Sequence, residues 1–251
     1  MTVYMDAVAC RKGESLCFFP ELGFLVSYRV VIGASLCYLI VILALRKFMR
    51  FRQPMDLYGA LVVYNIFQIV LSAVMTINLS PQLRNNFFNI NGRFASDIEF
   101  WILIHYCSKY VDMLDTVFIV CRKKDYQLSF LHLYHHCSIG VIWGILLTNG
   151  MGNGTAFFGA WINSLVHFLM YSHYLWTSLG FRNPLKFLLT KIQMFQFTLC
   201  ILHAAFVLLF DDDFGGGWVI SQIVYNISLL ALFMNFYLNS VRRASVEGKK
   251  Y

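Results

Sequence analysis

Residues 109–143 read KYVDMLDTVFIVCRKKDYQLSFLHLYHHCSIGVIW, and this stretch indicates both the fold and the site. It consists of two apolar runs with a hydrophilic break at residues 122–125. Both runs contain ionisable side chains, which are costly at membrane depth and therefore normally face a bundle interior and serve a function. These side chains are Lys109, Asp112 and Asp115 in the first run and His132, His135 and His136 in the second.

The spacing within each run indicates which of these groups meet. Residues three and four apart share one face of a helix, so the three histidines of the second run form a single imidazole patch. In the first run, the side chains along one side of the helix are close enough for the ammonium group to pair with a carboxylate. That side carries Lys109, Asp112, Asp115 and Thr116.

The composition is typical of a membrane protein. The chain has 251 residues, of which 59% are hydrophobic and only 13% are charged. The apolar residues gather in seven blocks, each near the roughly 20 residues that a membrane-spanning helix needs, and all four prolines lie between blocks, which favours uninterrupted helices. We therefore predict an all-α, polytopic membrane protein with seven transmembrane helices and one domain over residues 1–251. The approximate blocks are 25–45, 58–78, 98–120, 128–148, 155–179, 187–210 and 217–240.

Basic residues indicate the orientation in the membrane. They are concentrated in the segments after the first, third, fifth and seventh blocks, which by the positive-inside rule places the amino terminus in the lumen and the carboxyl terminus in the cytosol. The net charge of +7 would also attract a polyanionic substrate to the cytosolic end. Nothing in the sequence indicates a nucleic-acid partner. The basic residues are Arg46, Lys47, Arg50, Arg52, Arg122, Lys123, Lys124, Arg182, Lys186, Arg242, Arg243, Lys249 and Lys250.

Two features of the lumenal side remain open at this point. Cys10 and Cys17 are candidates for a disulfide bond. Asn153 begins an Asn-Gly-Thr glycosylation sequon in a predicted lumenal loop, very close to the membrane.

The histidine patch is compatible with two chemistries. Imidazoles bind iron or zinc, and they act as base or nucleophile near neutral pH. A membrane di-iron desaturase or hydroxylase has a related H-x-x-H-H signature, but it needs further histidine boxes, and no second one occurs here. The acid–base or nucleophile interpretation is therefore preferred, with no metal. A seven-span receptor or transporter is a further alternative.

The next two blocks also carry polar stripes at helical spacing. The fifth contains Asn163, His167, Met170, Tyr171 and Tyr174, and the sixth contains Thr190, Gln193 and Gln196. Four consecutive spans that each present polar groups imply a shared polar interior around a pocket or tunnel.

In these residues the chain resembles the ELO family of very-long-chain fatty acid elongases, which are membrane-bound 3-ketoacyl-CoA synthases. Four family boxes occur in order and at the right spacing: K-x-x-E-x-x-D-T, H-x-x-H-H, H-x-x-M-Y-x-Y-Y and T-x-x-Q-x-x-Q. Asp112 replaces the usual glutamate, and His173 stands where a tyrosine is usual. The matching residues are Lys109, Asp112, Asp115 and Thr116; His132, His135 and His136; His167, Met170, Tyr171 and Tyr174; and Thr190, Gln193 and Gln196.

The resemblance implies a barrel of six helices around a narrow acyl tunnel, with a further helix outside, in the endoplasmic reticulum membrane. It implies condensation of an acyl-CoA with malonyl-CoA to 3-ketoacyl-CoA, CO2 and CoA, without a cofactor. A reductase and a dehydratase of the elongation cycle are the expected partners. The implied catalytic residues are His132, His135, His136, His167, Lys109, Asp112 and Asp115, with Thr116, Gln127, Asn163, Met170, Tyr171, Tyr174, Thr190, Gln193 and Gln196 as candidate substrate contacts.

Two finer expectations complete the sequence analysis. His135 or His167 is expected to take the acyl group from CoA as an acyl-imidazole. Gln127, before the histidine box, and Leu133-Tyr134 within it are similar to elongase branches that act on polyunsaturated chains. Gln127 lies about one and a half helical turns before His132, so it would line only the mouth of a tunnel.

Overall fold

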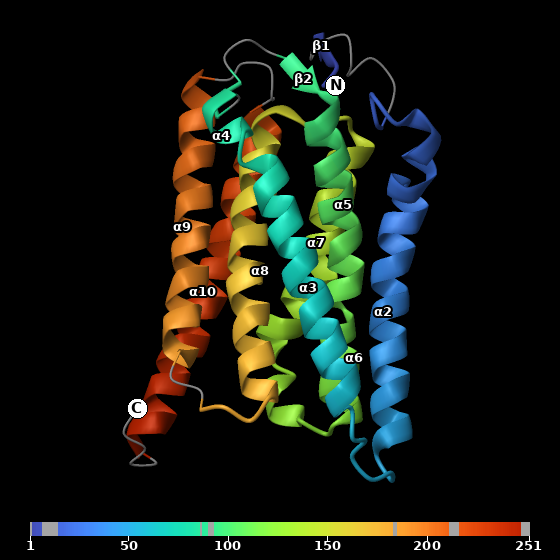
Figure 1. The fold of residues 1–251 in the computed structure, drawn as a ribbon, viewed down its shortest axis with the longest axis vertical. Coiled ribbons are helices and arrows are strands. Elements are labelled where there is room, and N and C mark those ends of the chain that lie inside the picture. The colour runs from blue at the N-terminus through green and yellow to red at the C-terminus, as the bar shows by residue number, and fades with distance from the viewer. Residues whose placement is uncertain are drawn as a thin grey trace.

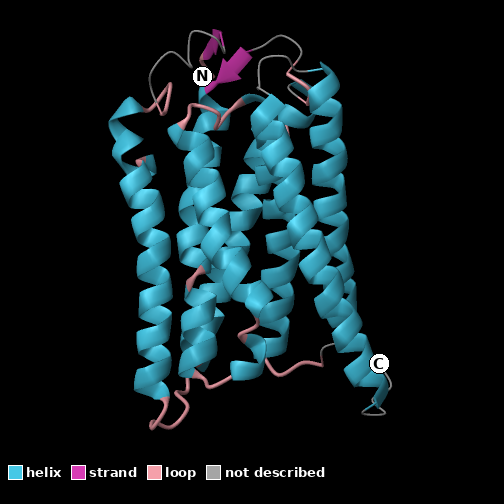
Figure 2. Ribbon diagram, turned by 180° about the vertical axis from the view of Figure 1, so that it is seen from behind, coloured by secondary structure: helices cyan, strands magenta, loops and turns pink. Residues whose placement is uncertain are grey.

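A computed structural model describes residues 2–6, 15–85, 87–89, 93–182, 185–210 and 216–246. These residues form a bundle of long helices with two very short strands at one end (Figures 1 and 2). The α-helices are α2 (Tyr28–Met49), α3 (Tyr58–Leu79), α4 (Gln82–Asn85), α5 (Ser96–Asp112), α6 (Leu114–Cys121), α7 (Phe130–Thr148), α8 (Phe157–Ser178), α9 (Lys186–Phe210) and α10 (Gly216–Val246). The 3₁₀ turns are η1 (Pro20–Val26), η2 (Asp125–Gln127) and η3 (Gly154–Ala156), and the strands are β1 (Tyr4–Asp6) and β2 (Arg93–Ala95).

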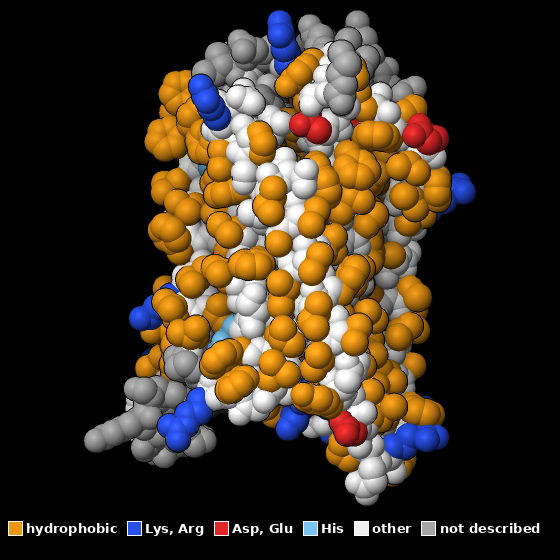
Figure 3. Space-filling view, viewed as in Figure 1, with side chains coloured by type: hydrophobic (Ala, Val, Ile, Leu, Met, Phe, Trp, Pro, Cys, Tyr) orange, Lys and Arg blue, Asp and Glu red, His pale blue; other side chains and the backbone are white. Residues whose placement is uncertain are grey.

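The helices have the length and surface of membrane spans. At 1.5 Å per residue, the 22 residues of α2 are long enough to cross a hydrocarbon core of about 30 Å. Within the described residues, five helical segments are apolar and long enough to cross a membrane. Figure 3 shows hydrophobic side chains over most of the face between the two ends. The prediction of an all-α polytopic membrane protein is confirmed, and the number of seven spans stays a prediction.

The contacts between helices form a closed ring of six. Helix α3 packs on α8, α8 on α9, α9 on α10, α10 on α7, α7 on α5, and α5 on α3. Helix α2 lies outside this ring against α6 and α7. The close approach of α2 and α7 requires a glycine, because a Cβ at Gly144 would lie 2.5 Å from a methyl group of Val31. The order of contacts agrees with the predicted ring and outer helix, whereas an acyl tunnel through the ring stays a prediction.

One predicted span is interrupted, which corrects the expectation of unbroken helices. The block at 98–120 is divided into α5 and α6 by a turn at Met113. Here the amide of Thr116 donates to the carbonyl of Met113, which is the tighter three-residue pattern of a 3₁₀ turn. The interruption lies between Asp112 and Asp115, and such irregular turns are frequent at functional sites.

At the end of the bundle that carries the strands, the buried side chain of Asn153 forms hydrogen bonds with the backbone of strand β2. Strand β1 pairs antiparallel with β2, with Tyr4 opposite Ala95. The side chain of Asn153 is 1% exposed, its Oδ1 accepts from the amide of Ala95 at 3.0 Å, and its Nδ2 donates to the carbonyl of Ala95 at 2.8 Å. Because this amide nitrogen is bonded and buried, the sequon is not accessible to a glycan in the folded chain. Cys10 lies outside the described residues, so its pairing with Cys17 stays a prediction.

Candidate active site

The three histidines of α7 lie together near the start of that helix. Ser129 is the N-cap, and its hydroxyl accepts the backbone amide of His132 at 3.2 Å, which fixes where the helix begins. The ring centroids of His132 and His136 are 4.3 Å apart, and those of His135 and His136 are 5.6 Å apart. The predicted imidazole patch is therefore present as a cluster of adjacent rings.

Two of these imidazoles have an unoccupied nitrogen in a buried position. Within the described part of the chain, Nδ1 of His135 and Nδ1 of His136 are buried and have no hydrogen-bond partner. A buried polar atom without a partner costs free energy, and such atoms in a folded protein call for an explanation. Contact of these two Nδ1 atoms with a bound substrate is such an explanation.

Lys109 forms the ion pair that its spacing predicts. Its Nζ lies 3.0 Å from Oδ2 of Asp112 and 3.0 Å from Oδ1 of Asn163 on α8. Lys109 is only 2% exposed and Asp112 is 3% exposed. A buried ion pair of this kind is tolerated because the remaining donors and acceptors also have partners.

The carboxylate of Asp112 connects three helices. Its Oδ1 accepts from the side-chain amide of Gln68 on α3 at 2.6 Å, and Nδ1 of His167 on α8 lies 3.6 Å from its Oδ2. The predicted basic, acidic and imidazole groups therefore form one cluster in the interior of the bundle.

Asp115 joins the same cluster through tyrosines. The hydroxyl of Tyr171 donates to Oδ2 of Asp115 at 2.8 Å, and it lies 3.3 Å from the hydroxyl of Tyr64 on α3. Tyr171 is fully buried, and its ring is 5.6 Å from that of His167. The hydroxyl of Tyr171 also lies 3.4 Å from Oδ1 of Asp112, so this phenol links the two aspartates, whereas the Lys109 ammonium pairs with Asp112.

Thr116 connects the outer helix to the histidine patch. Its Oγ1 lies 2.8 Å from Nε2 of His132 and 2.8 Å from the hydroxyl of Tyr38 on α2. Thr116 is fully buried, so it makes these two contacts without access to bulk solvent.

Other predicted residues have partners outside this cluster or lie at the surface. Gln193 on α9 donates to the sulfur of Met170 at 3.5 Å, and Thr190 donates to a backbone carbonyl of its own helix. Gln196 is buried on the same helix, α9. Tyr174 is 41% exposed, and Gln127 is exposed in η2, where it donates to the hydroxyl of Tyr126.

Several members of the site were missed by sequence reasoning. Tyr38, Tyr64 and Gln68 lie in the first two apolar blocks, where the sequence pattern predicts no site residue. The available signal was Gln68 itself, because a glutamine in a span is unusual, and Tyr64 lies one turn before it. His105 is also buried, with Ser164 at 3.4 Å from its Nδ1 and the ring of Trp143 at 4.8 Å.

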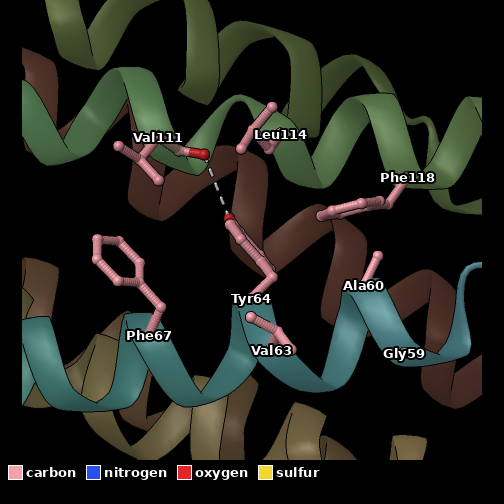
Figure 4. A pocket seen from close by; sticks show the side chains of 8 residues that line it. All are labelled: Gly59, Ala60, Val63, Tyr64, Phe67, Val111, Leu114 and Phe118. Atoms are coloured by element: carbon pink, nitrogen blue, oxygen red, sulfur yellow. Dashed lines mark hydrogen bonds between the residues drawn. The ribbon is translucent and has the colours of Figure 1, made fainter.

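Tyr64 also lines an apolar groove between α3 and the α5/α6 column (Figure 4). The groove has a volume of about 590 Å³, and Val63, Phe67 and Leu114 on its walls are exposed on the lipid-facing surface. The hydroxyl of Tyr64 points inward from it and donates to the carbonyl of Val111 at 3.4 Å. Tyr64 therefore separates the outer surface of the bundle from the buried carboxylates.

The chain is similar to proteins of one family over almost its whole length. Residues 24–249 match the model of the GNS1/SUR4 (ELO) family. Fatty acid elongase 4 of Trypanosoma brucei brucei is 62% identical over 245 residues, which cover 98% of this chain and 97% of that protein. Fatty acid elongase 5 of Trypanosoma cruzi is 54% identical, with 100% and 99% covered. The human very long chain fatty acid elongase 5 is 35% identical, with 86% and 75% covered.

Proposed function

Because the chain belongs to the ELO family of fatty acid elongases, we propose that its buried histidine cluster carries out the condensation that elongates an acyl-CoA. The enzyme is a 3-ketoacyl-CoA synthase that joins an acyl-CoA to malonyl-CoA, giving 3-ketoacyl-CoA, CO2 and CoA. The observation that carries the assignment of roles is the buried Nδ1 of His135, which has no hydrogen-bond partner in the described part of the chain and lies in the histidine patch of α7.

In the first step, Nδ1 of His135 attacks the thioester carbonyl of the acyl-CoA. A carbon–nitrogen bond forms, the carbon–sulfur bond breaks, and CoA leaves as a thiolate that takes up a proton. A neutral, enclosed imidazole is a competent nucleophile. His167 is less suited to this attack through Nδ1, because that nitrogen already faces the carboxylate of Asp112 at 3.6 Å.

In the second step, malonyl-CoA loses CO2, and its C2 carbanion attacks the acyl carbon. A carbon–carbon bond forms, the carbon–nitrogen bond to His135 breaks, and the departing imidazole takes up a proton from water in place of the one that left with CoA. We assign His167 the role of a base or orienting group that acts through its Nε2, because its Nδ1 faces the carboxylate of Asp112. Separating the two steps lets CoA depart before malonyl-CoA enters.

This order of steps predicts release of CoA from the first substrate alone. In purified enzyme incubated with a long-chain acyl-CoA and no malonyl-CoA, we expect about one equivalent of free CoA per active site in a single burst. A thiol-reactive dye that detects free CoA measures the burst. An active preparation that releases CoA only after malonyl-CoA is added would show a direct, one-step condensation instead.

We also propose that the preferred chains are polyunsaturated, on the similarity around Gln127 and Leu133-Tyr134. Gln127 is exposed in the 3₁₀ turn η2, so a preference for double bonds must come from residues deeper in the bundle. Competition between equal pools of a polyunsaturated and a saturated acyl-CoA should favour the polyunsaturated product by severalfold. A preference for the saturated chain would contradict the subclass and leave the elongase assignment intact.

The proposed location is the endoplasmic reticulum membrane, with the amino terminus in the lumen. Helices α2, α6, α8 and α10 all end at the lower end of the bundle in Figure 1, and the basic residues of the sequence lie in or after the last turns of these helices. His132 lies in the first turn of α7 at this same end, where a CoA headgroup would arrive from the cytosol. The whole chain, residues 1–251, then acts as one domain beside a reductase and a dehydratase that complete the cycle.

A further inference from the structure

We propose that Tyr38 is a positioning residue for the condensation, although it belongs to the helix outside the ring. Acting through Thr116, Tyr38 holds the imidazole of His132 in one orientation and one tautomer. This inference rests on the proposed catalytic role of the α7 histidines, because His132 matters here as a member of their patch.

The geometry is a chain of three side chains from three helices. The hydroxyl of Tyr38 on α2 lies 2.8 Å from Oγ1 of Thr116 on α6, and that oxygen lies 2.8 Å from Nε2 of His132 on α7. Tyr38 is 7% exposed and Thr116 is fully buried. Both distances are those of good hydrogen bonds, and bulk water does not compete for them.

The chemistry of the three groups sets the direction of the protons. Thr116 has one hydroxyl proton, so it can donate to only one of its two partners. A phenol is a better donor than an alcohol, and an imidazole nitrogen is a better acceptor than a phenol oxygen. Tyr38 therefore donates to Thr116, Thr116 donates to Nε2 of His132, and the ring proton of neutral His132 is on Nδ1.

A fixed His132 also constrains its neighbours in the patch. Its ring centroid is 4.3 Å from that of His136, and His136 is 5.6 Å from His135. Tyr38 on α2 therefore affects His135, the proposed nucleophile, through the positions of the His132 and His136 rings. One turn away on α2, Ser35 donates to the carbonyl of Cys137, a contact that holds α2 against α7 without touching an imidazole.

The chain offers a matched control for the loss of the Tyr38 hydroxyl. Tyr28 is on the same helix, and its hydroxyl accepts from the side chain of Asn149 at the far end of α7 at 2.9 Å, away from Thr116 and the histidine patch. Tyr38→Phe and Tyr28→Phe therefore remove the same atom and each remove one contact with neighbouring helices. Only the first is connected to His132.

Steady-state kinetics give the first test. Tyr38→Phe should lower kcat about threefold to tenfold and leave KM unchanged, which is the effect of one lost hydrogen bond on the reacting state. Tyr28→Phe should stay within about twofold of wild type. Thr116→Val should lower kcat further, because Nε2 of His132 then lacks a partner, and Thr116→Ser, which keeps the hydroxyl, should restore most of the activity.

A double-mutant cycle separates positioning from simple packing. Adding Tyr38→Phe to Thr116→Val should change kcat by less than about twofold, because the chain is already broken. Additive losses would show that Tyr38 acts independently of Thr116 and would overturn the inference.

Histidine-selective ¹⁵N labelling gives a readout that does not depend on turnover. The His132 signals, identified by their loss in His132→Gln, should report the Nδ1–H tautomer in wild type and in Tyr28→Phe, and should shift in Tyr38→Phe. Unchanged His132 signals in Tyr38→Phe would overturn the inference even if the variant is less stable. If His135→Ala stays active, the catalytic proposal fails, and the tautomer measurement still decides the role of Tyr38.

Discussion

His135→Ala is expected to lower turnover by roughly 10³-fold or more, since removal of a covalent nucleophile leaves only binding and electrostatic effects. The variant should also lose the burst of CoA release from acyl-CoA alone. Its folding should be preserved, because Nδ1 of His135 has no hydrogen-bond partner among the described residues, so none is left unpaired by its removal.

His203 provides a matched control for the loss of an imidazole. It is buried on α9, where its ring stacks on Phe158 at 4.3 Å and its Nε2 lies 3.0 Å from the carbonyl of Phe87. His203→Ala is expected to lower thermal stability while keeping the CoA burst per folded enzyme. A His135→Ala enzyme with a normal burst would transfer the nucleophile role to another residue.

Lys109→Met is expected to have the second-largest effect, and it should act on stability as well as activity. The substitution leaves Asp112 charged, buried and without its ammonium partner, which typically costs about 3–5 kcal/mol. We expect a lower yield of monodisperse protein, a clearly lower Tm in detergent and loss of condensation. Lys191→Met, at an exposed lysine of α9, should match wild type in all three measurements.

A double substitution distinguishes the structural from the catalytic part of this effect. Lys109→Met combined with Asp112→Asn removes both charges, and neutral replacement of a buried pair is often tolerated. The double variant should recover much of the Tm but not the activity, because His167 then lacks the carboxylate that faces its Nδ1. Full recovery of activity would show that the pair serves the fold alone.

Features that depend only on the residues within a single helix were predictable from the sequence. Most of the apolar blocks match one helix to within a few residues, because block length and the positions of the prolines are local properties. The histidine patch and the Lys109–Asp112 pair follow in the same way from spacings of three and four. Neither needs knowledge of which helices are neighbours.

Features that depend on contacts between helices were not predictable. Gln68 and Tyr38 enter the site only because α3 packs on α5 and α2 packs on α6, and no pattern in the sequence specifies these pairs. Tyr174 shares a helical face with Tyr171, yet it is 41% exposed while Tyr171 is buried, since the local packing decides burial. The turn at Met113 was also not predictable, because no proline or glycine, which usually mark a break in a helix, lies there.

The decisive test of the catalytic proposal is the mass of the intact enzyme after incubation with a long-chain acyl-CoA in the absence of malonyl-CoA. We predict an increase equal to one acyl group, which peptide mapping assigns to His135 and which disappears when malonyl-CoA is added. An active enzyme whose mass stays unchanged, or whose acyl group lies on a residue outside the histidine cluster, would contradict the covalent mechanism.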